Sequence, residues 1–231
     1  MKKLVSVLAA AGVAAAAVFG AVFSGGTGFW FASAAAALLC CVPFFLSFEK
    51  RAPSVGELVL VAVMTAFSAA GRFIFAPVPF FKPVAAIVAI AARHFGAQAG
   101  FMMGALSAVI SNIYFGQGPW TPFQMLCWGL IGLAAGSAGK RGLLDTPLPL
   151  CVFGVLAGIF YAFVMDVWTV ISMNGSFSGE LWAAAVISAL PVTGIYCVSN
   201  VIFMLILNKP LGKKLERLKT KYGVFLSKKV G

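Results

Sequence analysis

Hydrogen-bonding side chains gather in one short segment of an otherwise apolar chain. The segment runs from Phe115 to Gln124 and reads Phe-Gly-Gln-Gly-Pro-Trp-Thr-Pro-Phe-Gln. Its glycines and prolines are typical of a rigid turn. Its amides, hydroxyl and indole can donate or accept hydrogen bonds. This combination predicts a loop that recognises a small molecule.

The side chains in and beside this loop have two interpretations. One is recognition, and the other is that Tyr114, Trp120 and Trp128 form the aromatic belt found where membrane proteins meet water. A belt requires neither the amides nor the rigid Gly-Gln-Gly-Pro turn, so we favour recognition. The candidate ligand-binding residues here are Asn112, Tyr114, Gln117, Trp120, Thr121 and Gln124.

Three charged residues outside this loop are further candidates for the same site. Arg72 lies within an apolar run, where a charge at the bilayer centre costs about 2.5 to 3.5 kcal/mol and therefore needs a partner or a cavity. Asp166 is the acid expected at a similar depth. The two residues either form an ion pair that locks two helices or line a substrate cavity. Lys82, in the proline-rich segment 76–83, is a candidate for a second wall of that cavity.

Membrane-spanning helices are the elements that must position these residues. Hydrophobic residues make up 61% of the 231 and charged residues only 10%, and apolar runs of about 20 residues are long enough to cross a bilayer. The runs are apolar on every face, which excludes the alternating pattern of a β-barrel. We therefore expect an all-α polytopic membrane protein, with spans at 4–23, 29–48, 56–75, 83–94, 97–114, 121–139, 147–171 and 181–207.

The basic residues set the expected orientation. The net charge is +11, and the positive-inside rule accounts for it better than nucleic-acid binding does. With both termini in the cytoplasm, almost every Lys and Arg falls inside, and only Arg72 and Lys82 lie toward the outside. The loop from Phe115 to Gln124 then faces outward. The protein is expected in the cell membrane as a multi-pass protein that contacts the lipid bilayer.

The chain divides into three expected parts. Residues 1–55 form a two-helix N-terminal extension, residues 56–208 a six-helix core, and residues 209–231 a basic cytoplasmic tail. The first span is expected to be a retained helix, with a signal peptide as the alternative. In the tail, leucines at helical spacing predict a helix on the inner leaflet, with a cytoplasmic protein partner as the alternative.

Catalysis has little support in the sequence. His94 is the only histidine, so neither a histidine-rich metal cluster nor a Ser-His-Asp triad can be assembled. The chain has no Walker A motif for ATP hydrolysis. The five cysteines lie in apolar runs without metal-ligand spacing. We expect no enzyme activity, cofactor or metal, and an intramembrane enzyme acting on lipid is the alternative from another class.

The block from Glu57 to Gly136 resembles a known family. It contains Arg72, the pair Lys82-Pro83, the run from Phe115 to Pro122, and Trp128-Gly129. In these features it resembles the membrane substrate-binding subunits (S components) of energy-coupling factor (ECF) vitamin transporters, nearest to the cobalamin-type branch. The Gly-Gln-Gly-Pro-Trp-Thr-Pro run carries most of this resemblance.

The resemblance implies a six-helix core that captures a vitamin-like molecule in an outward pocket. Loops 76–82, 114–121 and 172–180 would hold the ligand, which is cobalamin or a related corrinoid, with a queuosine or nucleobase precursor as the alternative. The subunit would topple in the membrane against a T component, powered by two cytoplasmic ATPases. The family's Ala-x-x-x-Ala contact with the T component corresponds to Ala62 and Ala66, and Ala70 continues the spacing. The two N-terminal helices depart from the family's six-helix pattern.

Overall fold

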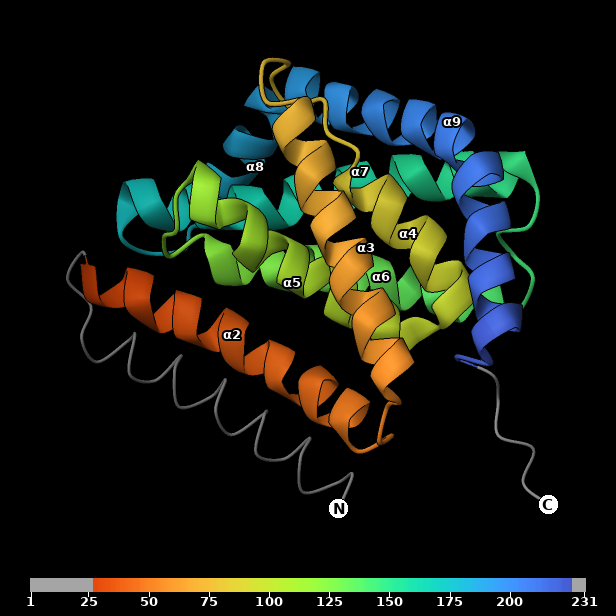
Figure 1. The fold of residues 1–231 in the computed structure, drawn as a ribbon. Helices are drawn as coiled ribbons and strands as arrows, with labels where there is room; N and C mark the ends of the chain where they lie inside the picture. The colour runs from red at the N-terminus through yellow and green to blue at the C-terminus, as the bar shows by residue number, and fades with distance from the viewer. Residues whose placement is uncertain (1–26, 226–231) are drawn as a thin grey trace.

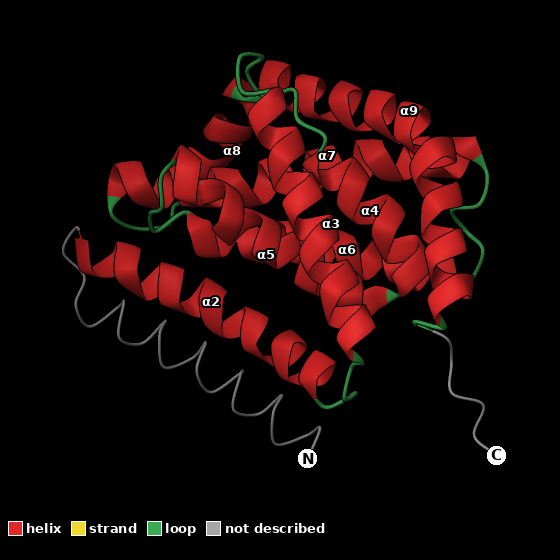
Figure 2. Cartoon of the chain, viewed as in Figure 1, coloured by secondary structure: helices red, strands yellow, loops and turns green. Residues whose placement is uncertain are grey.

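The computed structural model describes residues 27–225, and every regular element among them is a helix (Figures 1 and 2). This confirms the all-α prediction. Three of these helices, α3, α7 and α9, are long and apolar enough to cross a membrane. The helices are α2 (Thr27–Glu49), α3 (Val55–Ile74), α4 (Val84–Phe95), α5 (Ala97–Phe115), α6 (Thr121–Lys140), α7 (Pro147–Asn174), α8 (Gly179–Ser188) and α9 (Leu190–Tyr222).

Local sequence signals explain where these helices begin and end. Helix α3 starts with a capping box, in which the Ser54 side chain accepts from the Glu57 backbone and Glu57 accepts from the Ser54 backbone. Helices α6, α7 and α9 carry proline in their first turn. Helix α7 ends at Gly175, whose φ of 71° favours glycine. The predicted spans from 29–48 to 147–171 each match one helix, whereas span 4–23 lies outside the described residues.

The predicted span 181–207 is wrong in its extent. The structure divides it into α8 and α9, which meet at Ala189, and α9 continues to Tyr222. Pro191 in the first turn of α9 favours the new start. Pro210 lies inside α9, and the last part of α9 runs across the direction of its first part (Figure 1).

The short helix α4 forms the centre of the bundle. It packs against α3, α5, α6 and α9, and Ala86, Ala91 and Ala92 are completely buried. A helix covered by protein on all sides does not have to match the thickness of a bilayer. This explains why 12 residues are enough for α4.

Helices α5 and α6 approach each other closely through glycine. A Cβ atom at Gly104 would lie 2.1 Å from the carbonyl oxygen of Trp128, and one at Gly100 would lie 2.4 Å from that of Gly132. Only glycine permits this contact. The close packing fixes α5 and α6 as one unit, and both helices contribute residues to the cavity described below.

Helix α2 packs on this unit and is part of the bundle. The ring of Phe44 stacks on Phe101 of α5 with centroids 4.2 Å apart. The Gln98 side chain donates to Ser47 Oγ over 2.6 Å. The described helix of the N-terminal extension is therefore integrated with the core helices.

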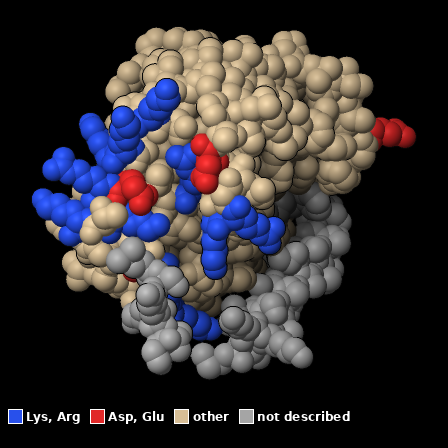
Figure 3. All heavy atoms as spheres, turned by 90° about the vertical axis from the view of Figure 1, so that its right-hand side faces the viewer, with Lys and Arg blue, Asp and Glu red and all other residues tan. Residues whose placement is uncertain are grey.

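Basic residues gather at one end of the bundle (Figure 3). Apart from Arg72 and Lys82, the described Lys and Arg residues lie in the α2–α3 turn, at the end of α4, around the α6–α7 loop and in the last part of α9. The α3–α4, α5–α6 and α7–α8 loops lie toward the other end (Figure 1).

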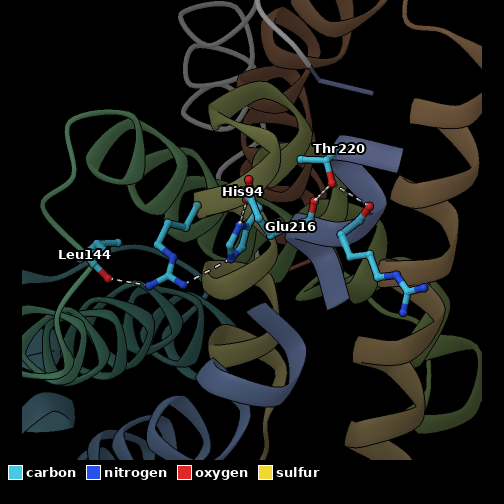
Figure 4. A network of polar contacts seen from close by, with 6 residues as sticks. His94, Leu144, Glu216 and Thr220 are labelled. Atoms are coloured by element: carbon cyan, nitrogen blue, oxygen red, sulfur yellow. Dashed lines mark hydrogen bonds and ion pairs between the residues drawn. The ribbon is translucent and has the colours of Figure 1, made fainter. Parts of the chain in front are cut away.

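A polar network ties the last part of α9 to the basic end (Figure 4). Arg93 Nη1 donates to the carbonyl oxygen of Leu144 over 2.7 Å, and His94 Nδ1 lies 3.1 Å from Glu216 Oε2. The predicted leucine stripe of the tail also faces the protein, because Leu215 is buried in the core and Leu211 and Leu218 pack beside it. These leucines are therefore covered by the bundle and do not face a lipid leaflet.

Candidate binding cavity

A cavity of about 390 Å3 opens between the α3–α4 loop and helices from across the bundle. Its size is within the range of about 300 to 1,000 Å3 that is typical of small-molecule sites. The wall combines two cations, several aromatic rings and two amides. The lining residues are Arg72, Ala76, Pro79, Phe80, Lys82, Val84, Ala85, Phe115, Gln124, Trp128, Gly158, Tyr161, Tyr196 and Asn200.

Arg72 is held in the cavity wall by neutral groups of α5. Its Nη1 donates to Ser111 Oγ over 2.5 Å and to Asn112 Oδ1 over 2.7 Å. The guanidinium carbon also lies 4.4 Å from the ring centroid of Phe115 and 5.2 Å from that of Trp128. These cation–π contacts favour a fixed position for the charge.

Asn112 connects Arg72 to the opposite wall. Only 1% of Asn112 is exposed, and its Nδ2 donates to Thr121 Oγ1 over 2.9 Å and to Gln124 Oε1 over 2.7 Å. Gln124 Nε2 then donates to the hydroxyl of Tyr161 over 3.1 Å. The chain of hydrogen bonds runs from α3 through α5 and α6 to α7, so it fixes four helices around the cavity.

Aromatic rings form the flat part of the wall. Trp128 and Tyr161 are nearly parallel, with 7° between their planes and 5.5 Å between their centroids. Tyr196 meets Tyr161 edge to face at 5.1 Å, and Phe80 meets Tyr196 edge to face at 5.9 Å. Rings in these arrangements stabilise one another, and all four of these residues line the cavity.

Lys82 closes the α3–α4 loop. Its amine donates to the backbone carbonyls of Phe75, Ala76 and Val78, while its own carbonyl accepts from Ser199 Oγ of α9 over 3.0 Å. Burial, and then the positive charge of Arg72, lower the pKa of the Lys82 amine. The second cation of the cavity is therefore fixed, close enough to Arg72 for the two charges to repel each other.

The family model of the ECF-type riboflavin transporter S component matches residues 53–217 of this chain. The chain belongs to this family. No curated protein and no solved structure shows a significant match to it. The match begins just before α3 and ends within α9, so it covers the core helices and leaves out α2.

Family membership establishes the general role of the protein. An S component is the substrate-binding membrane subunit of an ECF transporter and not an enzyme, which removes the lipid-enzyme alternative. It also implies a T component and ATPase subunits as partners. The family description names riboflavin, and the match gives no support to the cobalamin-type branch.

In this S component, the predicted binding residues fall into three groups according to their position relative to the cavity. Arg72, Lys82 and Gln124 line the cavity. Asn112 and Thr121 lie directly behind it in the hydrogen-bond network. The remaining predicted residues, Tyr114, Gln117, Trp120 and Asp166, do not belong to its lining, and neither does the predicted loop 172–180.

The loop from Phe115 to Gln124 mainly bonds to itself and to α5. Gln117 Nε2 donates to the carbonyl oxygen of Val109 over 2.8 Å, and its Oε1 accepts from Thr121 Oγ1 over 3.0 Å. The ring of Trp120 lies 6.5 Å from that of Trp168. The polar groups that suggested ligand recognition therefore hold the loop itself, and the loop positions Thr121 and Gln124.

The expected ion pair between Arg72 and Asp166 is absent from the described residues. Arg72 bonds to Ser111 and Asn112, and it forms no ion pair with Asp166. The carboxylate Oδ2 of Asp166 is buried without a hydrogen-bond partner. The hydrogen-bond partners of Arg72 are thus two neutral oxygens on the neighbouring helix α5.

Three polar cavity residues on the later helices were not predicted. Tyr161 belongs to α7, and Tyr196 and Asn200 belong to α9. Asn200 Nδ2 donates to the carbonyl oxygen of Gly154 over 3.0 Å, which joins α9 to α7. Their sequence signal is an amide and two phenol groups inside apolar spans. Polar groups at membrane depth commonly face a bundle interior or a cavity, so this signal could have identified them.

Proposed function

We propose that this S component binds a flat heteroaromatic vitamin of about the size of riboflavin. The main support is the aromatic wall of the cavity, where Trp128 and Tyr161 lie nearly parallel beside Tyr196 and Phe80. A planar ring system can stack on this surface and bury its apolar faces. Gln124 and Asn200 add amide side chains to the lining of the same cavity.

The dimensions of the cavity favour a flavin-sized ligand over a corrinoid. A volume of about 390 Å3 is near the lower end of the range for small-molecule sites. A corrin macrocycle with its side chains is several times larger than a three-ring flavin. Cobalamin, which the sequence resemblance suggested, is therefore the weaker candidate, and the name of the matching family supports riboflavin.

The proposal includes an orientation and a docking face. Basic residues gather away from the α3–α4 and α5–α6 loops (Figures 1 and 3), so the positive-inside rule supports an outward cavity and a cytoplasmic basic end. On α3, Ala62 and Ala66 are exposed next to Val63 and Phe67. Small residues let another helix approach closely, which supports this face, with the less exposed Ala70, as the T-component contact.

Equilibrium binding to the purified protein tests the proposed substrate. Riboflavin fluorescence is titrated with protein in detergent or nanodiscs, with cobalamin and queuine as competitors. We expect saturable quenching that neither competitor prevents. Trp128→Leu and Tyr161→Leu should weaken binding about tenfold or more, because each removes stacking surface. Tyr114→Leu is the matched control, since Tyr114 is 72% exposed and lies outside the cavity.

Two results would count against the proposal. Absence of saturable riboflavin binding, together with tight binding of cobalamin, would replace the flavin-sized ligand with a corrinoid. Equal loss of binding in the Tyr114 control and in the two cavity variants would show that the aromatic wall is not the binding surface.

A further inference from the structure

The cavity contains two positive charges and no negative one. Arg72 and Lys82 both line it, whereas no Asp or Glu does. All six acidic residues of the chain lie within the described residues 27–225. The ion pairs in that range are Arg51 with Glu57 and His94 with Glu216, and neither involves a cavity residue.

Arg72 also has hydrogen-bond donors that the protein leaves unused. A guanidinium carries five N–H groups, and the two on Nη1 are accounted for by Ser111 and Asn112. Among the described residues, Nη2 and Nε of Arg72 make no hydrogen bond. Neither atom is one of the fully buried side-chain atoms that lack a partner. The free edge of the guanidinium is therefore accessible, and it has the fork geometry that binds carboxylate or phosphate with two parallel hydrogen bonds.

Lys82 has a different role from Arg72. Its three N–H donors are directed to three backbone carbonyls, so it offers a ligand electrostatic attraction without a hydrogen bond. A buried charge is costly unless an opposite charge compensates it. Because Arg72 and Lys82 repel each other and no acidic residue lines the cavity, the opposite charge has to come from the ligand.

We infer that the substrate is an anion, in which a carboxylate or phosphate group pairs with the free edge of Arg72 while a flat ring stacks on Trp128 and Tyr161. This inference rests on the proposed function, since it takes the cavity to be the substrate site. It selects acidic heteroaromatic vitamins and phosphorylated forms such as riboflavin 5′-phosphate over neutral riboflavin.

Pairs of ligands that differ only in charge test this inference. Riboflavin 5′-phosphate is compared with riboflavin, and nicotinate with nicotinamide, by titration at low and high salt. We expect the anionic member of each pair to bind about tenfold more tightly or better, because hydrogen bonds to a charged partner are the strong ones. Nicotinate and riboflavin 5′-phosphate compete if they share the Arg72 edge. High salt should reduce the preference for the anion.

Two variants assign the preference to Arg72. Arg72→Gln should abolish the preference for the anion while leaving the stacking surface in place. Asn112→Asp keeps the arginine and supplies a carboxylate next to it, so it should also reduce the preference. The second variant addresses the case in which Arg72→Gln fails to fold, and thermal unfolding of both variants identifies that case.

The outcomes separate this inference from the proposed function. Riboflavin binding as tight as that of its phosphate overturns the anion inference and leaves the flavin-sized substrate intact. If neither flavin binds, the proposed substrate fails, and a nicotinate preference that depends on Arg72 still supports the anion inference. The anion inference is overturned if neither pair shows a preference for the anion. Undetectable binding of all four compounds counts as this result.

Discussion

Replacing Asn112 with alanine removes the residue that joins the two halves of the cavity wall. The change deletes the hydrogen bond from Arg72 Nη1 to Asn112 Oδ1, and the bonds from Asn112 Nδ2 to Thr121 and Gln124. It leaves Arg72 with Ser111 alone on that side. The site is 1% exposed, so water cannot readily replace the lost partners.

The expected loss of stability follows from these three bonds. A hydrogen bond to a charged group contributes about 1.5 to 3 kcal/mol, and a neutral one about 0.5 to 1.5 kcal/mol. The three bonds share one network, so their contributions are not additive. We expect Asn112→Ala to lower the free energy of unfolding by about 3 kcal/mol, which corresponds to about 6 to 12 °C in melting temperature for a domain of this size.

Thermal unfolding in detergent, followed by intrinsic tryptophan fluorescence, measures this loss. Asn174→Ala is the matched control, because Asn174 is exposed at the end of α7 and bonds only to Ser176. The control should stay within about 0.5 kcal/mol of the wild type. A melting temperature for Asn112→Ala equal to that of the control would refute the network as the support of the cavity.

Three further predictions concern the packing, the docking face and the basic end. Gly104→Ala should destabilise by about 1 to 3 kcal/mol because its Cβ would meet the α6 backbone, whereas Gly194→Ala, with open space around it, should be neutral or slightly stabilising in thermal unfolding. The double variant Ala62→Leu with Ala66→Leu should bind ligand normally but lose co-purification with the T component; retained co-purification would contradict the docking face. Glu57→Ala should cost about 1 to 2 kcal/mol because it loses the capping box and a bond from the Phe225 backbone, and an unchanged denaturation midpoint would contradict this.

Sequence patterns predicted the helices well where apolar runs end at glycine, proline or charge. The α5–α6 turn is an example, because Gly116 and Pro119 interrupt two apolar runs. The boundary between α8 and α9 was missed because residues 181–207 are apolar on both sides of Ala189. Pro191 was the only local signal there, and a proline in a long span is equally compatible with a kink.

The candidate site was only partly predictable from sequence. Arg72 and Lys82 were found because charge is rare in apolar sequence. The hydrogen-bond partners of Arg72 were not predicted, because its Nη1 donates to neutral oxygens of Ser111 and Asn112 on α5, whereas charge matching pointed to Asp166. Tyr161 and Tyr196 are far from the loop in sequence, and only the packing of α7 against α6 and of α9 against α4 and α7 brings them to the cavity.

Mass spectrometry of the ligand that co-purifies with the protein tests the central claim most directly. The wild type is purified from cells grown in rich medium, and Trp128→Leu is purified in parallel. The account predicts a flat heteroaromatic compound of about the size of riboflavin in the wild type and its depletion in the variant. A corrinoid, or a non-aromatic compound retained equally by both proteins, would contradict it.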